Sequence, residues 1–245
     1  PPLPLPDASE GPPPLDRQET PCSPYRHLPA DLVLIGDIDG GGVACALGAG
    51  SAEYLRARMH VVDWMVGVCP RLELGDEVLH RGVHLLDRVM QCDPVETSQL
   101  QELAGAVLVL ASKYEEPACI TAHDIAGVAG GALNARRVAC VEWRAARVLG
   151  YRLGGGTARC WALRLGVTLT PLHRYLLDQA LLDSDAMALA RPALARQLRG
   201  AEASPAPWRA RLQRFAKATR HGGCRALRAK HPRHAELEQR VLRPP

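Results

Sequence analysis

Residues 100–116 read LQELAGAVLVLASKYEE and are the most informative stretch of the chain. From Leu103 to Ala111 they include no charged or hydrogen-bonding side chain. A helix with one side in solvent would carry a polar residue every three or four positions, so this run is typical of a helix enclosed on every side. A buried strand can be as apolar, but strands rarely last this long, and Ala and Leu favour helix. Pro117 then blocks further helix and leaves a Lys-Tyr-Glu-Glu sequence at the tip.

The composition indicates a helical protein from a reducing compartment. The chain has 245 residues, enough for one large domain or two small ones, and 47% of them are apolar. Only one residue is Phe, so the core must consist mostly of Leu, Val and Ala. The eight cysteines stand singly, without a C-x-x-C pair, which argues against a zinc module or a disulfide framework. We expect no transmembrane helix, because no run of about 18 apolar residues occurs, and no signal peptide.

Positive charge is concentrated toward the end of the chain. The formal net charge is +4, yet residues 191–245 contain 14 Lys or Arg against three Glu, a net charge of about +11. The remainder is therefore mildly acidic. A basic tail over residues 205–245 could bind nucleic acid or an acidic partner, or it could be solvated and partly disordered. The sequence favours the solvated tail.

Helical periodicity predicts a five-helix bundle in residues 51–153. The preceding residues, 1–50, are rich in Pro and Gly and are predicted to be disordered. Apolar residues at three- and four-residue spacing predict helices over about 53–69 and about 76–93, ahead of the enclosed helix. Together with two helices that follow, these elements indicate an all-α bundle packed around its middle member.

Capping residues mark the two helices after the enclosed one. Thr121 is suited to an N-cap, and Asp124 three residues on completes a capping-box-like arrangement. The fifth helix begins after Asn134 and ends at Gly150, a residue suited to a helix C-cap.

A second, thinner helical domain is predicted after Gly154–Gly156, which we interpret as a hinge or linker. Apolar periodicity resumes at Thr157 and fades after Leu198. We therefore assign residues 154–204 to a partial second domain, and residues 205–245 to a basic tail with short helices.

The sequence offers no convincing constellation for catalysis or metal binding. His80 and His84 are spaced as i and i+4 and could share a metal, but no third ligand is evident. Arg88, four residues further on, favours a cationic stripe instead. No nucleophile–base pair or phosphate-binding loop occurs. We expect no catalytic residue, metal, cofactor or membrane contact.

Three motifs identify a family resemblance. Val62-Asp63-Trp64, Leu86-Asp87-Arg88 and Ala111-Ser-Lys-Tyr-Glu-Glu116 are similar to the signatures of the first three helices of the cyclin box, in the family's order and spacing. The resemblance covers residues 53–165 and continues more weakly over residues 176–185, which are similar to the start of the second cyclin fold. It implies an atypical cyclin, with a five-helix box around a buried central helix and a degenerate or shortened second cyclin-like domain. The subfamily stays open between cyclin P-like and A- or B-like members.

The resemblance implies a regulatory subunit, not an enzyme, that binds and activates a cyclin-dependent serine/threonine kinase. Such a protein acts in the cell cycle or a related process, in the nucleus and/or cytoplasm. By position, Lys113 and Glu142 match the Lys and Glu that grip the kinase beside its C-helix, and the 29 residues between them match the family's spacing. The remaining implied kinase-contact positions, two matched by motif and two on the same face of the fifth helix, are Tyr151, Leu153, Trp143 and Ala146.

A substrate-docking patch is also implied, in weakened form. Where the family has Met-Arg-Ala-Ile-Leu, this chain has Ala-Arg-Met-His-Val at residues 57–61, so Ala and His replace two long apolar side chains. Each buried apolar side chain is worth about 1.5–3 kcal/mol, so we expect weak capture of substrate or inhibitor docking peptides. The patch consists of Ala57, His60, Trp64, Leu100 and Gln101.

Two alternative functions remain. One is a cyclin-fold adaptor that has lost kinase activation. The other is a nucleic-acid- or transcription-associated protein that uses the basic tail, which is disfavoured because it gives Lys113 and Glu142 no role. Arg58 and Asp63 are interpreted as structural, forming a solvated or intramolecular pair.

Overall fold

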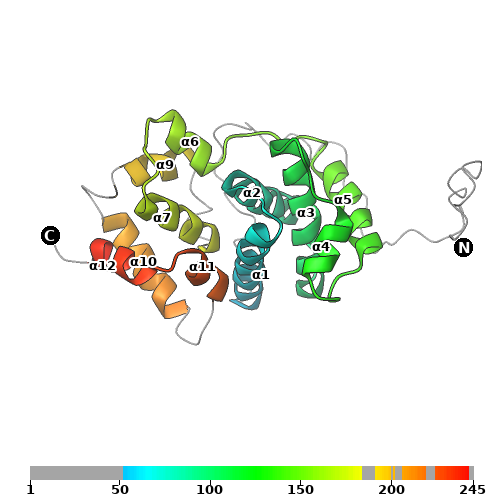
Figure 1. Ribbon diagram of the computed structural model, residues 1–245, viewed down its shortest axis with the longest axis horizontal. Helices are drawn as coiled ribbons and strands as arrows, with labels where there is room; N and C mark the ends of the chain where they lie inside the picture. Colours follow the sequence, from blue (N-terminus) through cyan, green and yellow to red (C-terminus); the bar gives the residue numbers. More distant parts are fainter. Residues whose placement is uncertain (1–51, 184–190, 200, 202–205, 219–223, 243–245) are drawn as a thin grey trace, which may run out of the picture. The chain divides into compact units, whose positions relative to one another are not determined.

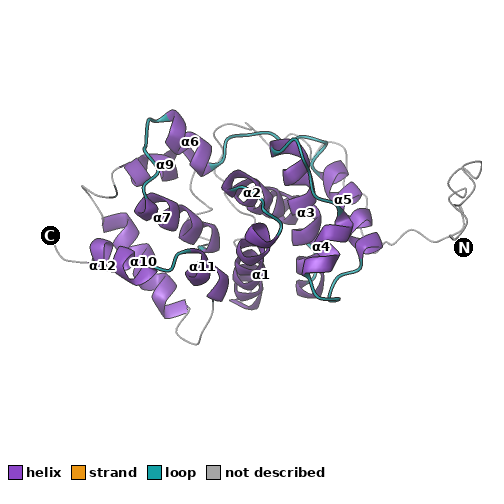
Figure 2. Ribbon diagram, viewed as in Figure 1, coloured by secondary structure: helices purple, strands orange, loops and turns teal. Residues whose placement is uncertain are grey.

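The computed structural model describes residues 52–183, 191–199, 201, 206–218 and 224–242, and all regular secondary structure in them is helical (Figures 1 and 2). The segment predicted to be disordered, residues 1–50, lies outside them. None of the described helices is long and apolar enough to span a membrane. The helices are α1 (Ala52–Arg71), α2 (Asp76–Cys92), the 3-10 helix η3 (Thr97–Gln99), α3 (Leu100–Glu115), α4 (Ala122–Val128), α5 (Ala135–Val148), α6 (Ala158–Arg164), α7 (Pro171–Leu182), α9 (Arg191–Arg199), α10 (Ala206–Ala218), α11 (Arg225–Lys230) and α12 (His234–Leu242).

Helix α3 is the centre of the first helical unit, by which we mean helices α1 to α5, as its apolar sequence predicts. Every residue from Leu103 to Ser112 is buried, and α1, α2, α4 and α5 all pack against the helix. An unpaired polar side chain in this position would be costly. Ser112, the one polar residue of the run, is satisfied because its hydroxyl accepts a hydrogen bond from the amide of Ile120 at 2.9 Å. The prediction of a five-helix box around a buried central helix is confirmed.

Gly105 allows α4 to approach α3 closely. A Cβ atom at this position would lie 2.7 Å from Cγ2 of Ile125, closer than real side chains come. Ile125 is fully buried against α3. A larger residue at position 105 would therefore push α4 away from the core.

The predicted caps of α4 and α5 are present. The carboxylate of Asp124 accepts a hydrogen bond from the amide of Thr121 at 2.7 Å, and the Thr121 hydroxyl accepts from the amide of Asp124. At the start of α5, the side chain of Asn134 accepts from the backbone amides of the second and third helical residues. These bonds satisfy amides that have no partner within the helix, and so fix where both helices begin.

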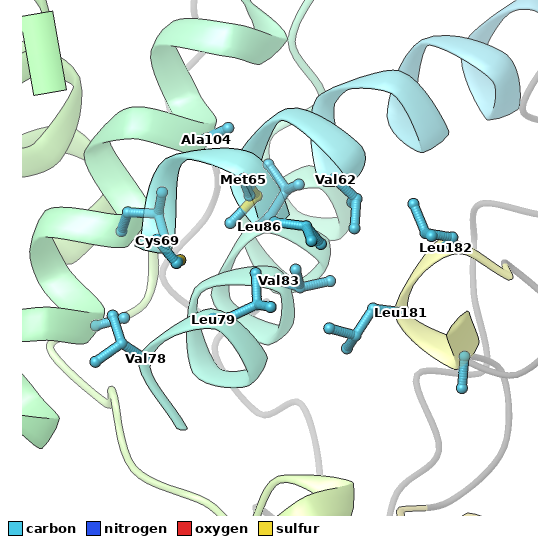
Figure 3. Packing of buried hydrophobic residues seen from close by; sticks show 14 of the residues in the cluster. Val62, Met65, Cys69, Val78, Leu79, Val83, Leu86, Ala104, Leu181 and Leu182 are labelled. Atoms are coloured by element: carbon cyan, nitrogen blue, oxygen red, sulfur yellow. The ribbon is translucent and has the colours of Figure 1, made fainter. Parts of the chain in front are cut away.

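Helices α1 and α2 pack against each other and also against α7. Figure 3 shows apolar side chains of α1 and α2 pointing toward one another, with Leu181 and Leu182 of α7 beside them. All of these residues belong to one cluster of buried side chains. The hydrophobic core is therefore continuous from α1–α2 into α7.

The basic end of the chain differs from the solvated tail favoured by the sequence. Trp208, Leu212 and Phe215 of α10 are buried, as are Leu237 and Val241 of α12. Helix α10 packs against α12, α12 against α7, and α11 against α1. The apolar residues are spaced to give each basic helix one inward-facing side. Burial of that side stabilises the packed helix, although the opposite side is highly charged. The sequence-based boundary at residue 204 stays an interpretation.

Arg58 and Asp63 do not pair with each other. The Arg58 guanidinium instead binds both carboxylate oxygens of Asp87 on α2, at 2.7 and 2.8 Å, and donates to the carbonyl of Leu181 at 3.0 Å. The carboxylate of Asp63 accepts from the backbone amides of residues 226 and 227 and so caps α11 from α1. The structural role is as expected, but the pairing is wrong, because the two side chains serve different neighbours of α1.

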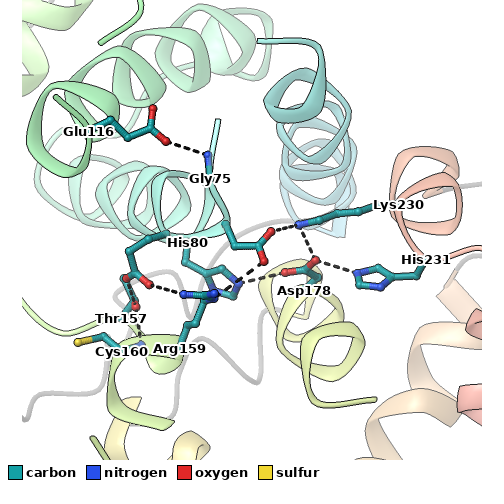
Figure 4. A network of polar contacts seen from close by, with 11 residues as sticks. Gly75, His80, Glu116, Thr157, Arg159, Cys160, Asp178, Lys230 and His231 are labelled. Carbon is teal, nitrogen blue, oxygen red and sulfur yellow. Dashed lines mark hydrogen bonds and ion pairs between the residues drawn. The ribbon is translucent and has the colours of Figure 1, made fainter. Parts of the chain in front are cut away.

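A buried polar cluster joins α2, α7 and α11 (Figure 4). Asp178 of α7 lies within 3.0 Å of His80 on α2 and within 2.8 Å of both Lys230 and His231. Burial alone would raise the pKa of the Asp178 carboxyl. The hydrogen bonds from His231 and His80, with the charge of Lys230, outweigh burial and hold this pKa well below its ordinary value. The cluster therefore ties the end of α11 to α7 and α2.

Candidate functional site

The C-terminal end of α3 and the middle of α5 bring Lys113 and Glu142 together. The Lys113 Nζ atom lies 2.6 Å from Oε1 of Glu142, although 29 residues separate them in the chain. Lys113 is in the last turn of α3, where the helix dipole favours a cation. Its side chain is 48% exposed, while that of Glu142 is 15% exposed. The pair is therefore accessible at the surface from the lysine side.

Arg81 of α2 organises the surroundings of this pair and was not identified from the sequence. Its buried guanidinium pairs with Glu115, donates to the carbonyls of Leu153 and Gly155 at 3.0 and 2.9 Å, and lies 4.4 Å from the ring centroid of Tyr114. One side chain thus joins the end of α3 to the segment after α5. Its signal in the sequence was a cation on the otherwise apolar face of a predicted helix.

The chain leaves α5 in an unusual backbone conformation. Gly150 and Tyr151 both have a φ of 57°, in the left-handed region. This conformation is ordinary for Gly and costly for Tyr. Tyr151 is also 67% exposed, whereas Leu153, two residues later, is half-buried. Arg88 of α2 holds the same segment by donating to the carbonyl of Arg152 at 2.6 Å.

The outer face of α5 presents Trp143, whose side chain is 60% exposed. The guanidinium of Arg147, one turn later, lies 4.6 Å from the centroid of the indole ring. Ala146 instead belongs to the buried core cluster, so it offers little surface to a partner. Of the six predicted kinase-contact residues, the structure pairs Lys113 with Glu142, exposes Trp143 and Tyr151, half-buries Leu153 and buries Ala146.

The residues of the predicted docking patch on α1 and α3 differ in their exposure. Leu100 is fully buried, and Ala57, Trp64 and Gln101 are half-buried. His60 is exposed. The long aliphatic side chain of the patch, Leu100, thus lies in the core, and weak capture of docking peptides stays a prediction.

His80 and His84 do not converge on a metal. His80 is engaged by Asp178, and His84 is buried, with no hydrogen-bond partner for its Nδ1 atom among the described residues. Burial, reinforced by the charges of Arg191, Arg88 and Arg81, holds the pKa of His84 well below its ordinary value. The described parts of the chain contain no group of three or more His, Cys, Asp or Glu side chains arranged to hold a metal ion.

Comparisons with known proteins agree with this architecture. Residues 49–154 match the model of the cyclin N-terminal domain. The G2/mitotic-specific cyclin-B2 of Oryzias javanicus is 32% identical over 137 residues, which are 54% of this chain and 35% of that protein. The cyclin-B2 proteins of Gallus gallus and Homo sapiens are 32% and 29% identical over 136 residues, 53% of this chain and 34% of each. The chain thus spans about a third of the length of these relatives.

The fold extends the likeness beyond the first helical unit. The crystal structure of a viral cyclin from herpesvirus saimiri superimposes with a TM-score of 0.55, at 14% identity, over 77% of this chain and 83% of that one. At this identity the likeness concerns the fold alone. Residues 49–154 are therefore a cyclin N-terminal domain, and the fold of the described helices is similar to that of a solved viral cyclin.

Proposed function

We propose that this protein is a regulatory subunit that binds and activates a cyclin-dependent serine/threonine kinase. The observation that supports this best is the exposed pair of Lys113 and Glu142 at the end of α3. An ammonium and a carboxylate side by side can bind a carbonyl and an amide of a docked backbone segment, and such charge-assisted hydrogen bonds are strong. On docking, the two groups would exchange their mutual contact for these bonds.

Activation by such a partner needs no catalytic residue of its own. In protein kinases the C-helix carries the Glu that must pair with the ATP-positioning Lys. A protein that holds this helix inward therefore shifts the kinase toward its active arrangement. The chemistry stays in the kinase, and the cyclin supplies the binding energy that selects the active state.

Tyr114 follows Lys113 and Trp143 follows Glu142 in the chain, and exposed aromatic side chains such as these can supply apolar contact. Tyr114, Trp143 and Tyr151 are among the most exposed large side chains of the described residues. Tyr and Trp are enriched among residues that dominate binding energy at interfaces. Arg81 fixes Tyr114 and the segment after α5 relative to α3, so this surface is organised before a partner arrives.

We assign the protein to cell-cycle or related regulation, in the nucleus and/or cytoplasm. The docking patch gives it little means to recruit substrate or inhibitor peptides, because Leu100 is buried and His60 is polar. An adaptor without kinase activation is distinguished from the proposed function by measuring activity as well as binding. A nucleic-acid function is distinguished by a salt-dependent shift of DNA mobility that depends on the arginines of residues 206–242.

The test is capture of kinases from a panel of purified cyclin-dependent kinases, followed by a phosphorylation assay. We expect the wild-type chain to bind and activate at least one kinase, and Lys113→Ala/Glu142→Ala to lose most of that binding. The matched control is Glu102→Ala/Arg137→Ala, which removes another ion pair between α3 and α5, at 2.9 Å, and should leave binding intact. Failure of the wild type to bind any kinase, or equal binding by both double variants, would overturn the assignment. Binding without activation would favour the adaptor.

A further inference from the structure

Three of the five charged side chains of α5 form ion pairs, and the other two have no carboxylate partner among the described residues. Glu142 pairs with Lys113. Arg137 pairs with Glu102 of α3, and Arg144 pairs with Asp93, the C-cap residue of α2. Arg136 has no carboxylate partner among the described residues, and its side chain is exposed. Arg147 is also exposed and contacts the ring of Trp143 rather than a carboxylate. Helix α5 therefore carries two uncompensated positive charges.

These two arginines lie on one face of the helix with Trp143 between them. Arg136, Cys140, Trp143 and Arg147 occupy positions i, i+4, i+7 and i+11, which fall on the same side of an α-helix. All four side chains are exposed, and we call them the outer α5 stripe. At 1.5 Å per residue, the two arginines are about 16 Å apart along the axis, or three helical turns.

We propose that the outer α5 stripe binds an acidic amphipathic helix of the partner, with an apolar side chain against Trp143 and carboxylates facing Arg136 and Arg147. This rests on the proposed function, since the partner helix belongs to the kinase. The stripe therefore selects among kinases by the charge of the helix that docks on α5.

Charge complementarity is the reason for an acidic occupant. A neutral or basic helix would desolvate two arginines without a compensating partner, which costs free energy, whereas carboxylates replace the lost water contacts. The stack of Arg147 on Trp143 holds the cation beside the apolar contact before binding. The length of the stripe, about three turns, suits a helix laid along α5.

A nucleic acid is a poorer occupant of this surface. Glu142 is the chain neighbour of Trp143. The carboxylates of Asp93 and Glu102 pair with Arg144 and Arg137, which are next in sequence to Trp143 and Arg136. Phosphates tracking the stripe would approach these carboxylates, whereas a peptide can place its own charges only at the two arginines.

The test uses two synthetic helical peptides of about 18 residues that share one apolar stripe and differ only in flanking Glu or Lys residues. Each is titrated into the full chain at low ionic strength. We expect the Glu-flanked peptide to bind about fivefold tighter than the Lys-flanked one, as two exposed ion pairs allow. Arg136→Gln/Arg147→Gln should abolish that preference, and Arg136→Glu/Arg147→Glu should reverse it, with melting temperatures unchanged because both side chains are exposed.

Equal binding of the two peptides, preference for the Lys-flanked one, or binding of neither at millimolar concentration would overturn the proposal. Tighter binding of single-stranded DNA, lost in the same variants, would overturn it in favour of a nucleic acid. The kinase panel separates this inference from the proposed function. If kinases bind and the arginine variants bind them as well as the wild type does, the stripe fails and the Lys113–Glu142 assignment stands. If no kinase binds, the proposed function is wrong. The peptide titration then still tests whether the stripe prefers an acidic helix.

Discussion

Two ion pairs of this protein join residues 29 positions apart and have opposite surroundings. Arg58 and Asp87 lie between α1 and α2, with side chains 2% and 1% exposed, and Arg58 also binds a carbonyl of α7. Lys113 and Glu142 lie between α3 and α5, with the lysine half exposed. The first pair has exchanged all its water for protein contacts, so breaking it leaves a buried charge. The second keeps water on one side, so it can exchange its partner for another at little cost.

The largest effect is expected from breaking the buried pair. Arg58→Met removes the guanidinium and leaves the Asp87 carboxylate buried without its partner, which should lower the free energy of unfolding by about 3–5 kcal/mol. Urea denaturation followed by circular dichroism measures this. The double variant Arg58→Met/Asp87→Leu, which removes both charges, should recover much of the loss. A single variant that loses less than about 1 kcal/mol would show that the pair is not structurally important.

A second effect concerns His84, a buried side chain whose Nδ1 atom has no hydrogen-bond partner in the part of the chain that the structure describes. Burial and three nearby arginines hold the pKa of His84 well below its ordinary value of 6.5. As the pH falls below 6.5, the unfolded chain takes up a proton at this residue and the folded protein does not. The contribution of neutral His84 to the free energy of unfolding is therefore fully present above pH 6.5 and is lost below it. The loss should be about 1–2 kcal/mol between pH 7 and pH 5.

The comparison that isolates this effect is between the wild type and His84→Gln, whose side chain is polar but does not titrate. The free energy of unfolding, measured by denaturant melts at several pH values between 5 and 7, should decrease less for the variant than for the wild type as the pH is lowered. Parallel curves for the two proteins would mean that His84 takes up its proton equally well in the folded and unfolded states.

Tyr151 is expected to lower the stability of the fold while contributing to kinase binding. Its φ of 57° is unfavourable for any residue with a Cβ atom, so Tyr151→Gly should raise the free energy of unfolding by about 0.5–1 kcal/mol. The same change removes an exposed aromatic ring from the proposed interface and should weaken kinase binding at least about tenfold. Thermal melts and titration with the captured kinase measure the two quantities. A variant that loses stability would mean that the ring contributes more to the fold than its backbone conformation costs.

The sequence predicted those features that depend on neighbours along the chain. The enclosed helix was recognisable because residues 103–111 have no polar side chain, and the caps at Thr121 and Asn134 because their partners lie within three residues. The position of Lys113 opposite Glu142 was implied by family spacing and not by the residues themselves. Each of these signals is contained within one helix or one motif.

The sequence did not predict contacts between distant segments. Asp63 caps α11, whose amides come more than 160 residues later, and a pairing with nearby Arg58 was the interpretation that sequence proximity suggested. Arg81 was not identified as a site residue, because its partners are backbone carbonyls of the segment after α5, more than 70 residues later. Short helices were expected in the basic tail, but the burial of α10 and α12 was not, because their apolar residues are few and separated by polar and charged ones. Such choices among partners depend on the assembled core.

The smallest change in stability is expected at the exposed pair. Lys113→Ala removes a half-exposed ammonium and leaves Glu142 with access to water, so the free energy of unfolding should fall by less than about 1 kcal/mol. The difference from the wild type should vanish in about 1 M NaCl, where exposed charges are screened. Denaturant melts at low and high salt measure both expectations. A salt-independent loss above about 2 kcal/mol would place this pair in the same class as Arg58 and Asp87. The loss of kinase binding expected for its variants would then reflect damage to the fold, whereas a small, screened effect leaves the pair free to bind a partner.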